Sequence, residues 1–206
     1  MLFSGGLYLI TGLNPINSFD VEKFQIGILQ QREIPDLLAL QRDNLKQNLD
    51  AQTVERQGFV SFVYDEPTMV GMMEGAPQIV ARDGNLLVGY ALSATKEYAK
   101  TMVLMKPLIA LCDILSYSNT PLSIARYYIM GQVCIRDGYR SMGIFDALYA
   151  GHKQYLSSQF DYLITEIADD NKRSLAAHRR VGYKTIHQYF EEETGKHWHV
   201  VLWDFT

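Results

Sequence analysis

Apolar side chains recur along this chain with two different periods, and these periods predict its elements. Alternation of apolar and polar positions indicates strands, whereas apolar positions three and four apart indicate helices. The predicted strands are 24–29, 78–82, 86–93, 128–135, 162–167, 184–190 and 198–205, and the predicted helices are 34–49, 67–74, 105–115, 144–157 and 171–180. Asp83-Gly84-Asn85 is a hairpin signal between two of these strands. The predicted order is therefore a strand, two helices and a hairpin, then a third helix, two strand–helix pairs and two final strands.

The stretch from Gln132 to Leu148 joins a buried strand to a helix through a short polar loop. The loop contains Asp137, Gly138, Arg140, Ser141 and Gly143. The first N–H groups of a helix lack internal partners and carry partial positive charge, so a glycine-containing loop before a helix can bind an anion. The alternative is an ordinary strand-to-helix turn with a solvated arginine.

This loop resembles a known motif. Arg140-Ser141-Met142-Gly143-Ile144 is similar to the R/Q-x-x-G-x-G/A loop of the GNAT superfamily of acyl-CoA-dependent N-acyltransferases. Phe145 stands at the last position, where that family usually has Gly or Ala. The departure affects how closely the loop can pack on a pyrophosphate, while the backbone amides remain in place.

A second motif follows at a suitable distance. The segment from Asn171 to Tyr183, NKRSLAAHRRVGY, resembles the family's N-x-x-A/S-x-x-x-Y-x-x-x-G-F/Y pattern, with His178 where tyrosine is commonest. Two ordered motifs separated by one helix and one strand are more specific than either alone. The resemblance extends over about residues 24–205 and is closest from Val133 to Tyr183. It implies an α/β protein of the GNAT fold, with a mixed, mostly antiparallel central sheet flanked by helices.

The same resemblance implies acetyl-CoA as cosubstrate and assigns the residues that bind it. In GNAT folds two central strands diverge, here 128–135 and 162–167, and the pantetheine arm enters the gap. The implied cofactor-binding residues are Val133, Cys134, Ile135, Arg140, Ser141, Met142, Gly143, Ile144, Phe145, Asn171 and Ser174. Val133 and Ile135 act through their backbone groups, and Asn171 and Ser174 orient the cofactor from the opposite side.

The implied reaction is direct attack of an acceptor amine on the thioester, which needs a base for the amine and a proton for the leaving thiolate. His178 occupies the position of the family's acid, and a packed, hydrogen-bonded histidine is its alternative. Glu166 is the best carboxylate base, and its alternative is a structural hydrogen bond to the Asn171 loop. Cys134 lacks an obvious histidine partner, so a buried thiol is the simpler interpretation than a nucleophile.

Composition narrows the class of protein. The chain has 206 residues, 48% hydrophobic and 20% charged, which is typical of a globular domain. We expect an N-terminal arm over 1–22 and a single domain over 23–206. The net charge of −4 does not favour nucleic acid as a partner. The apolar start of the chain is interrupted by polar residues and glycines and is preceded by no basic residue, so we expect neither a signal peptide nor a membrane partner.

Cysteines and histidines give two further expectations. Cys112 and Cys134 both lie in apolar segments, and reduced thiols in the cytoplasm are the simplest interpretation. His187, His197 and His199 on neighbouring strands could bind zinc, but exposed strand histidines are the simpler account, so we expect no metal.

The sequence therefore predicts an N-acetyltransferase that transfers an acetyl group from acetyl-CoA to a primary amine. The acceptor is left open between a small amine, an amino acid, an antibiotic and a protein N-terminus. A non-catalytic acyl-CoA-binding module of the same fold is the alternative, and a metal-binding protein is a second one. A methionine cluster at Met69, Met72 and Met73 would permit a longer acyl donor, although core filling is its commoner role. A homodimer through the C-terminal strands is an option in such folds.

Overall fold

The computed structural model describes residues 18–21, 23–49, 59–193 and 195–206. Within them a single large sheet has eight strands in the order β1-β2-β3-β4-β7-β8-β10-β9, and a separate small hairpin pairs β5 with β6. The strands are β1 (Ser18–Val21), β2 (Phe24–Ile28), β3 (Ile79–Asp83), β4 (Leu86–Thr95), β5 (Ser116–Tyr117), β6 (Thr120–Pro121), β7 (Tyr127–Ile135), β8 (Tyr162–Ala168), β9 (Lys184–Glu191) and β10 (Lys196–Asp204). All neighbours in the large sheet are antiparallel except β7 and β8, which are parallel. This confirms the predicted mixed, mostly antiparallel sheet.

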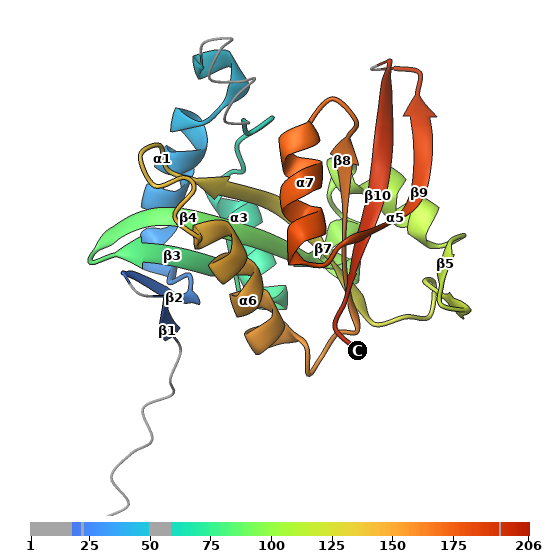
Figure 1. Cartoon of the computed structure of the whole chain (residues 1–206), viewed down its shortest axis with the longest axis horizontal. Coiled ribbons are helices and arrows are strands. Elements are labelled where there is room, and N and C mark those ends of the chain that lie inside the picture. The colour runs from blue at the N-terminus through green and yellow to red at the C-terminus, as the bar shows by residue number, and fades with distance from the viewer. Residues whose placement is uncertain (1–17, 22, 50–58, 194) are drawn as a thin grey trace, which may run out of the picture.

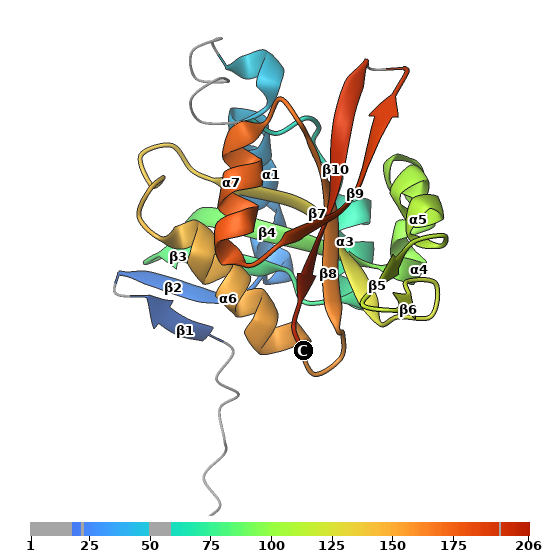
Figure 2. The same cartoon turned by 45° about the vertical axis from the view of Figure 1, so that its right-hand side comes forward.

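Helices cover both faces of the sheet (Figure 1 and Figure 2). They are α1 (Ile34–Asp43), α3 (Glu66–Gly75), α4 (Lys96–Ala99), α5 (Lys106–Cys112), α6 (Ile144–Leu156) and α7 (Lys172–Val181), with 3-10 turns η1 (Gln31–Glu33), η2 (Lys46–Asn48) and η3 (Val103–Met105). The helices α1, α3, α4 and α5 pack on one face through one apolar cluster, while α6 and α7 pack on the other face through a second cluster. None of the helices in the described part of the chain combines the length and the apolar character needed to span a membrane.

Most predicted elements are present with small changes at their ends. Gly84, in the predicted hairpin turn, has a φ of +58°. The predicted helix 105–115 is shorter than expected, because η3 precedes α5 and α5 ends at Cys112. Met69 and Met72 are both fully buried in the core, as in the core-filling interpretation of the methionine cluster.

The first predicted helix is wrong at its C-terminal end. Its apolar spacing continues to Leu49, but α1 ends at Asp43. The Val60 amide donates to the Asn44 carbonyl and the Lys46 amide donates to the Val60 carbonyl, at 2.9 and 3.0 Å. These bonds to a distant segment replace the next helical bonds, so tertiary pairing ends the helix where local spacing would continue it.

The predicted N-terminal arm lies largely outside the described residues, which begin at Ser18. Residues 18–21 form β1 and pair antiparallel with β2, with Ser18 opposite Gly27. The division into an arm over 1–22 and one domain over 23–206 stays a prediction.

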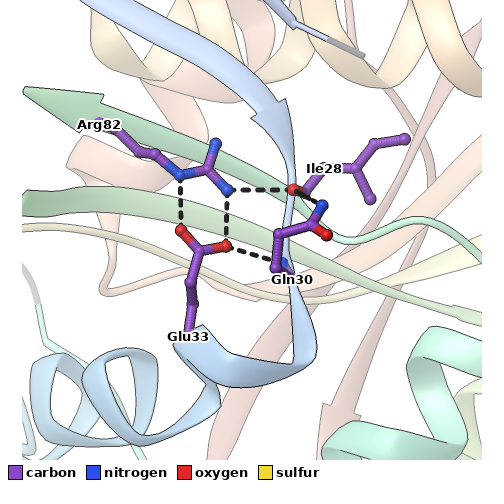
Figure 3. Close-up of polar contacts among 4 residues, drawn as sticks. All are labelled: Ile28, Gln30, Glu33 and Arg82. Carbon is purple, nitrogen blue, oxygen red and sulfur yellow. Dashed lines mark hydrogen bonds and ion pairs between the residues drawn. The ribbon is translucent and has the colours of Figure 1, made fainter. Parts of the chain in front are cut away.

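An ion pair joins the start of α1 to the sheet (Figure 3). Arg82 of β3 donates to both carboxylate oxygens of Glu33, at 2.6 and 2.7 Å, and also to the Ile28 carbonyl at 3.0 Å. Glu33 accepts a further bond from the Gln30 amide at 2.7 Å. Burial raises the pKa of Glu33, but the bonds from Arg82 and Gln30 outweigh it and hold the pKa below its ordinary value. Glu33 therefore stays ionised and anchors the entry to α1.

We predict that Arg82→Met destabilises the fold by about 2 kcal/mol, because it leaves the mostly buried Glu33 carboxylate without its cation. Lys196→Met is the control, since Lys196 pairs with the exposed Asp170 at 3.5 Å and such pairs contribute about 0 to 1 kcal/mol. Urea unfolding of both variants measures the two losses. Equal small losses would show that the Arg82 pair contributes no more than an exposed one.

Candidate active site

The two central parallel strands separate after a short paired region. β7 and β8 pair only at Tyr127↔Tyr162, Tyr128↔Leu163 and Ile129↔Ile164. One position further along, the Thr165 hydroxyl donates to the Met130 carbonyl at 3.2 Å in place of a backbone bond. Figure 1 shows the strands running apart from there. The far half of β7 therefore has a backbone edge inside the sheet that no strand of the described residues covers.

The direction of the backbone groups on this edge follows from the pairing with β4. The Arg136 amide donates to the Val88 carbonyl, and the register from Gln132 to Ile135 is regular. Backbone groups alternate between the two edges of an antiparallel strand. Cys134 therefore turns its amide and carbonyl toward β4, whereas Val133 and Ile135 turn theirs toward the gap.

A cavity of about 350 Å³ lies at this edge. All of the predicted cofactor-binding residues except Met142 line it, namely Val133, Cys134, Ile135, Arg140, Ser141, Gly143, Ile144, Phe145, Asn171 and Ser174. The Met142 side chain is 51% exposed and is absent from the lining. Segments that are far apart in the sequence thus meet at one cavity, which joins the β7 edge to the starts of α6 and α7.

The loop before α6 has the backbone geometry of an anion cradle. Gly143 is the N-cap of α6 with a φ of +81°, and Ser141 also has a positive φ, +63°. The Ala147 amide donates to the Gly143 carbonyl at 3.0 Å as the first bond of the helix. The amides of Ile144 and Phe145 precede that bond and have no helical acceptor. Apart from its chain neighbours, no atom of the described residues lies within 4 Å of a Cβ built on Gly143, so a side chain at this position would have open space.

Arg140 is held at the cavity wall rather than solvated, so the alternative of a solvated arginine is wrong. Its guanidinium donates to the Ile135 carbonyl at 3.2 Å, to Asp137 at 3.3 Å and to the Asn44 side chain at 2.6 Å. The side chain is 13% exposed. Arg140 therefore links the loop, the end of β7 and the residue after α1.

Part of the cavity wall comes from residues that carry no motif in the sequence. Asn44, Phe59 and Val60 come from the chain after α1, where no local pattern marks them. On α7, the lining residues Arg173, Ala176, Ala177 and Arg180 are three or four positions apart. That spacing puts them on one helix face and could have been recognised. Arg180 also bonds Asp146 of α6 at 2.7 Å, which ties the two helices together beside the cavity.

Asn171 and Ser174 form the N-terminal cap of α7. The Asn171 side chain accepts a bond from the Ser174 amide at 3.1 Å. Both residues line the cavity from the side opposite β7. The amides at the start of α7 thus lie beside the same cavity as three arginine side chains, Arg140, Arg173 and Arg180, of which Arg140 and Arg180 are paired with Asp137 and Asp146.

His178 is buried beneath the cavity and does not line it. Its Nδ1 lies 2.8 Å from the Ser174 carbonyl, and its Nε2 lies 2.6 Å from the Tyr149 hydroxyl. A carbonyl can only accept, so Nδ1 carries the proton and Nε2 accepts from Tyr149. Burial lowers the pKa of His178 to about 4, which keeps the imidazole neutral. These contacts are those of a packed histidine, and the acid role stays a prediction.

Glu166 lies outside the cavity lining, on β8. Its carboxylate accepts a bond from the Tyr189 hydroxyl of β9 at 2.8 Å. The alternative bond to the Asn171 loop is not the one that forms. Burial raises the pKa of Glu166, an effect that the Tyr189 bond partly offsets. A carboxylate with a raised pKa suits a base near neutral pH, and this role also stays a prediction.

Two alternatives from the sequence remain, a nucleophilic Cys134 thiol and a metal site formed by His187, His197 and His199. Burial raises the pKa of the Cys134 thiol to about 11, so the thiol stays protonated and is a poor nucleophile. The register places His187 opposite Val200, on the face away from His199. Among the described residues no group of three His, Cys, Asp or Glu side chains is arranged to hold a metal ion.

Comparison with known proteins places this geometry in a fold class. No family model matches the sequence, and no curated protein matches it. Solved structures do match. They include the NatC complex bound to Gag peptide and CoA (12% identity, 89% of this chain and 99% of that chain, TM-score 0.59). They also include yncA from Salmonella typhimurium with its cofactor acetyl-CoA (11% identity, 89% and 95%, TM-score 0.57). An acetyltransferase of the GNAT family from Streptococcus pneumoniae is a third (10% identity, 87% and 97%, TM-score 0.56). The chain therefore has the GNAT fold over nearly its full length.

The buried His178 makes the stability of the protein acid-sensitive. Its pKa is about 4 in the folded state and 6.5 when exposed, so between these values the unfolded chain binds a proton that the folded chain does not. Stability therefore falls as the pH falls from 7 toward 4, by about 3 kcal/mol for this residue. We predict that His178→Phe removes this part of the loss, as measured by urea unfolding at pH 7 and pH 4.5.

The control is His197→Phe, which replaces an exposed histidine and leaves His178 in place. Its loss of stability between the two pH values should equal that of the original protein. If His178→Phe shows the same loss, His178 does not carry the acid sensitivity.

Proposed function

We propose that this protein is an acyl-CoA-dependent N-acetyltransferase that transfers the acetyl group of acetyl-CoA to a primary amine. One observation carries the proposal. A single cavity connects the uncovered edge of β7 with the open amides at the start of α6, between strands that separate after three paired positions. The GNAT fold, present in structures solved with acetyl-CoA or CoA, supports the same function.

The lining residues fit the chemical groups of acetyl-CoA. The backbone groups of Val133 and the amide of Ile135 present strand-like donors and acceptors, which suit the amides of the pantetheine arm, while the Ile135 carbonyl already accepts a bond from Arg140. The loop from Arg140 to Phe145 offers free amides at a helix N-terminus for the pyrophosphate. Asn171 and Ser174 lie across the cavity and orient the cofactor from α7.

In the proposed reaction the neutral amine nitrogen bonds to the acyl carbon, the carbon–sulfur bond breaks and the sulfur leaves with the bonding electrons. The proton lost by the amine goes to Glu166, directly or through water, and the leaving thiolate receives a proton. His178 has the position that a tyrosine usually has in the family and is the proposed acid, and it can give this proton only as an imidazolium, a form that its lowered pKa disfavours at neutral pH. Replacement of the imidazole then lowers turnover more than acetyl-CoA affinity.

A second candidate function is a non-catalytic acyl-CoA-binding module of the same fold. The specific observation that favours it is that neither His178 nor Glu166 lines the cavity. Binding of acetyl-CoA with no transfer to any amine in a broad screen identifies this alternative. A cytoplasmic location and a homodimer also stay predictions.

We predict that Gly143→Glu abolishes acetyl-CoA binding, because it places a side chain and a negative charge beside the amides that receive the pyrophosphate. Gly138→Glu is a closely matched control. The two glycines have φ values of +81° and +80°, both are exposed, and a Cβ on either would meet nothing within 4 Å, but only Gly143 lines the cavity.

Calorimetric titration with acetyl-CoA measures both variants. The expected result is binding by Gly138→Glu close to that of the original protein and none by Gly143→Glu. Equal affinities for the two variants would contradict the cradle.

We predict that Glu166→Gln lowers kcat/KM for an amine acceptor by about 10²-fold, because glutamine cannot take the proton. The carboxylate must be ionised to act, so the rate falls as the pH falls through its raised pKa. Tyr189→Phe removes a donor that favours the ionised form, and the acid limb of the profile then moves to higher pH. An unchanged rate in Glu166→Gln would exclude Glu166 as the base.

A further inference from the structure

A buried tyrosine hydroxyl without a hydrogen-bond partner among the described residues lies against β7 two residues after the last position that pairs with β8, and its residue, Tyr64, is not among those that line the cavity. The Tyr64 side chain is 6% exposed, and its hydroxyl bonds to no atom of the described residues. An unpaired buried polar group costs on the order of 1–3 kcal/mol, so its retention needs an explanation.

The hydroxyl lies directly against Gly131 of β7. A Cβ built on Gly131 would lie 2.8 Å from the Tyr64 hydroxyl oxygen, which is closer than real atoms approach, and 3.4 Å from Met72 Cε. Only glycine therefore leaves room for the hydroxyl at this position. Gly131 comes two residues after Ile129, the last residue of β7 that pairs with β8.

The pairing on the other side of β7 is also irregular at this residue. Leu92 pairs with Gln132 and Ser93 pairs with Met130, so Gly131 has no partner on β4. Such bulges re-aim backbone groups and are common beside active sites. The bulge, the end of the parallel pairing and the unpartnered hydroxyl thus coincide at Gly131.

Bonds from two other elements hold Tyr64 in place. Its amide donates to the Gln41 side chain of α1 at 2.9 Å. The Gln132 side chain of β7 donates to the Phe62 carbonyl at 3.0 Å, and the Phe62 and Tyr64 rings pack edge to face at 4.9 Å. The segment that carries Tyr64 is therefore fixed to the strand that borders the gap.

We propose that the Tyr64 hydroxyl is a catalytic hydrogen-bond donor to the acyl carbonyl oxygen of the bound thioester, an inference that rests on the proposed function. Negative charge develops on that oxygen as the amine nitrogen bonds to the acyl carbon. When the carbon–sulfur bond breaks, the oxygen re-forms the carbonyl double bond and the sulfur leaves with the bonding electrons. Tyr64 donates a hydrogen bond throughout and keeps its proton, because burial raises the pKa of its hydroxyl. A fixed donor that needs no reorganisation during the reaction is the most effective kind.

The first test is the carbonyl ¹³C resonance of acetyl-CoA labelled at the carbonyl carbon, bound to the protein. A donated hydrogen bond moves this resonance downfield. We expect the downfield shift in the original protein and its loss in Tyr64→Phe, with acetyl-CoA still bound. The control is Tyr155→Phe on α6, because its hydroxyl is also buried without a partner among the described residues. That variant should keep the shift.

The second test uses Gly131→Ala. The added methyl group should displace the Tyr64 hydroxyl, lower the melting temperature and reduce the carbonyl shift. In the Tyr64→Phe background the clashing oxygen is gone, so the same substitution should lower the melting temperature by less. With an amine acceptor, Tyr64→Phe should lower kcat by about 10²-fold and change KM for acetyl-CoA little.

The outcomes separate the two proposals. Bound acetyl-CoA with the same carbonyl shift in Tyr64→Phe and in the original protein would overturn the role of Tyr64 and leave the proposed function intact. Failure of the original protein to bind acetyl-CoA would overturn the proposed function, and this inference with it.

Discussion

The backbone of β7 beyond Met130 faces a sheet neighbour that turns away. Buried amides and carbonyls need partners, and β8 pairs with β7 at only three positions. At the next position the Thr165 hydroxyl, not a backbone amide, donates to the Met130 carbonyl. The result is an uncovered strand edge in the interior of a sheet rather than at its rim. Such an edge is a template for an extended ligand with amide groups, and the cavity lies along it.

The gap persists because polar bonds hold its walls in place. Arg140 joins the loop before α6 to the end of β7 and to Asn44, and Arg180 joins α7 to Asp146 of α6. The pair of Arg82 and Glu33 fixes the entry to α1 on the outer part of the sheet. Each of these bonds links elements that are distant in the sequence. Bonds within the protein thus fix the walls of the cavity, which reduces the cost of ordering them around a ligand.

The groups proposed to act in the reaction lie on both sides of the sheet. Glu166 shares the face of Ile164, two residues earlier on β8, and Ile164 packs with the helices α1, α3 and α5. Tyr64 belongs to the same apolar cluster. His178 instead contacts Tyr149 of α6 on the opposite face. The gap between β7 and β8 lies between these two sides, and none of the three groups is among the residues that line the cavity.

The sequence by itself determined the order of the elements, the loop from Arg140 to Phe145 and the start of a helix at Asn171, because periodicity and glycine positions are local properties of the chain. It also indicated the fold, through two motifs whose spacing is preserved. Only the tertiary structure decided that α1 ends at Asp43, that Asn44 and Val60 join the cavity, and that His178 is buried with both ring nitrogens bonded. Tyr64 was beyond prediction for the same reason: its position depends on packing against Gly131, which is 67 residues away, and no local pattern encodes that contact.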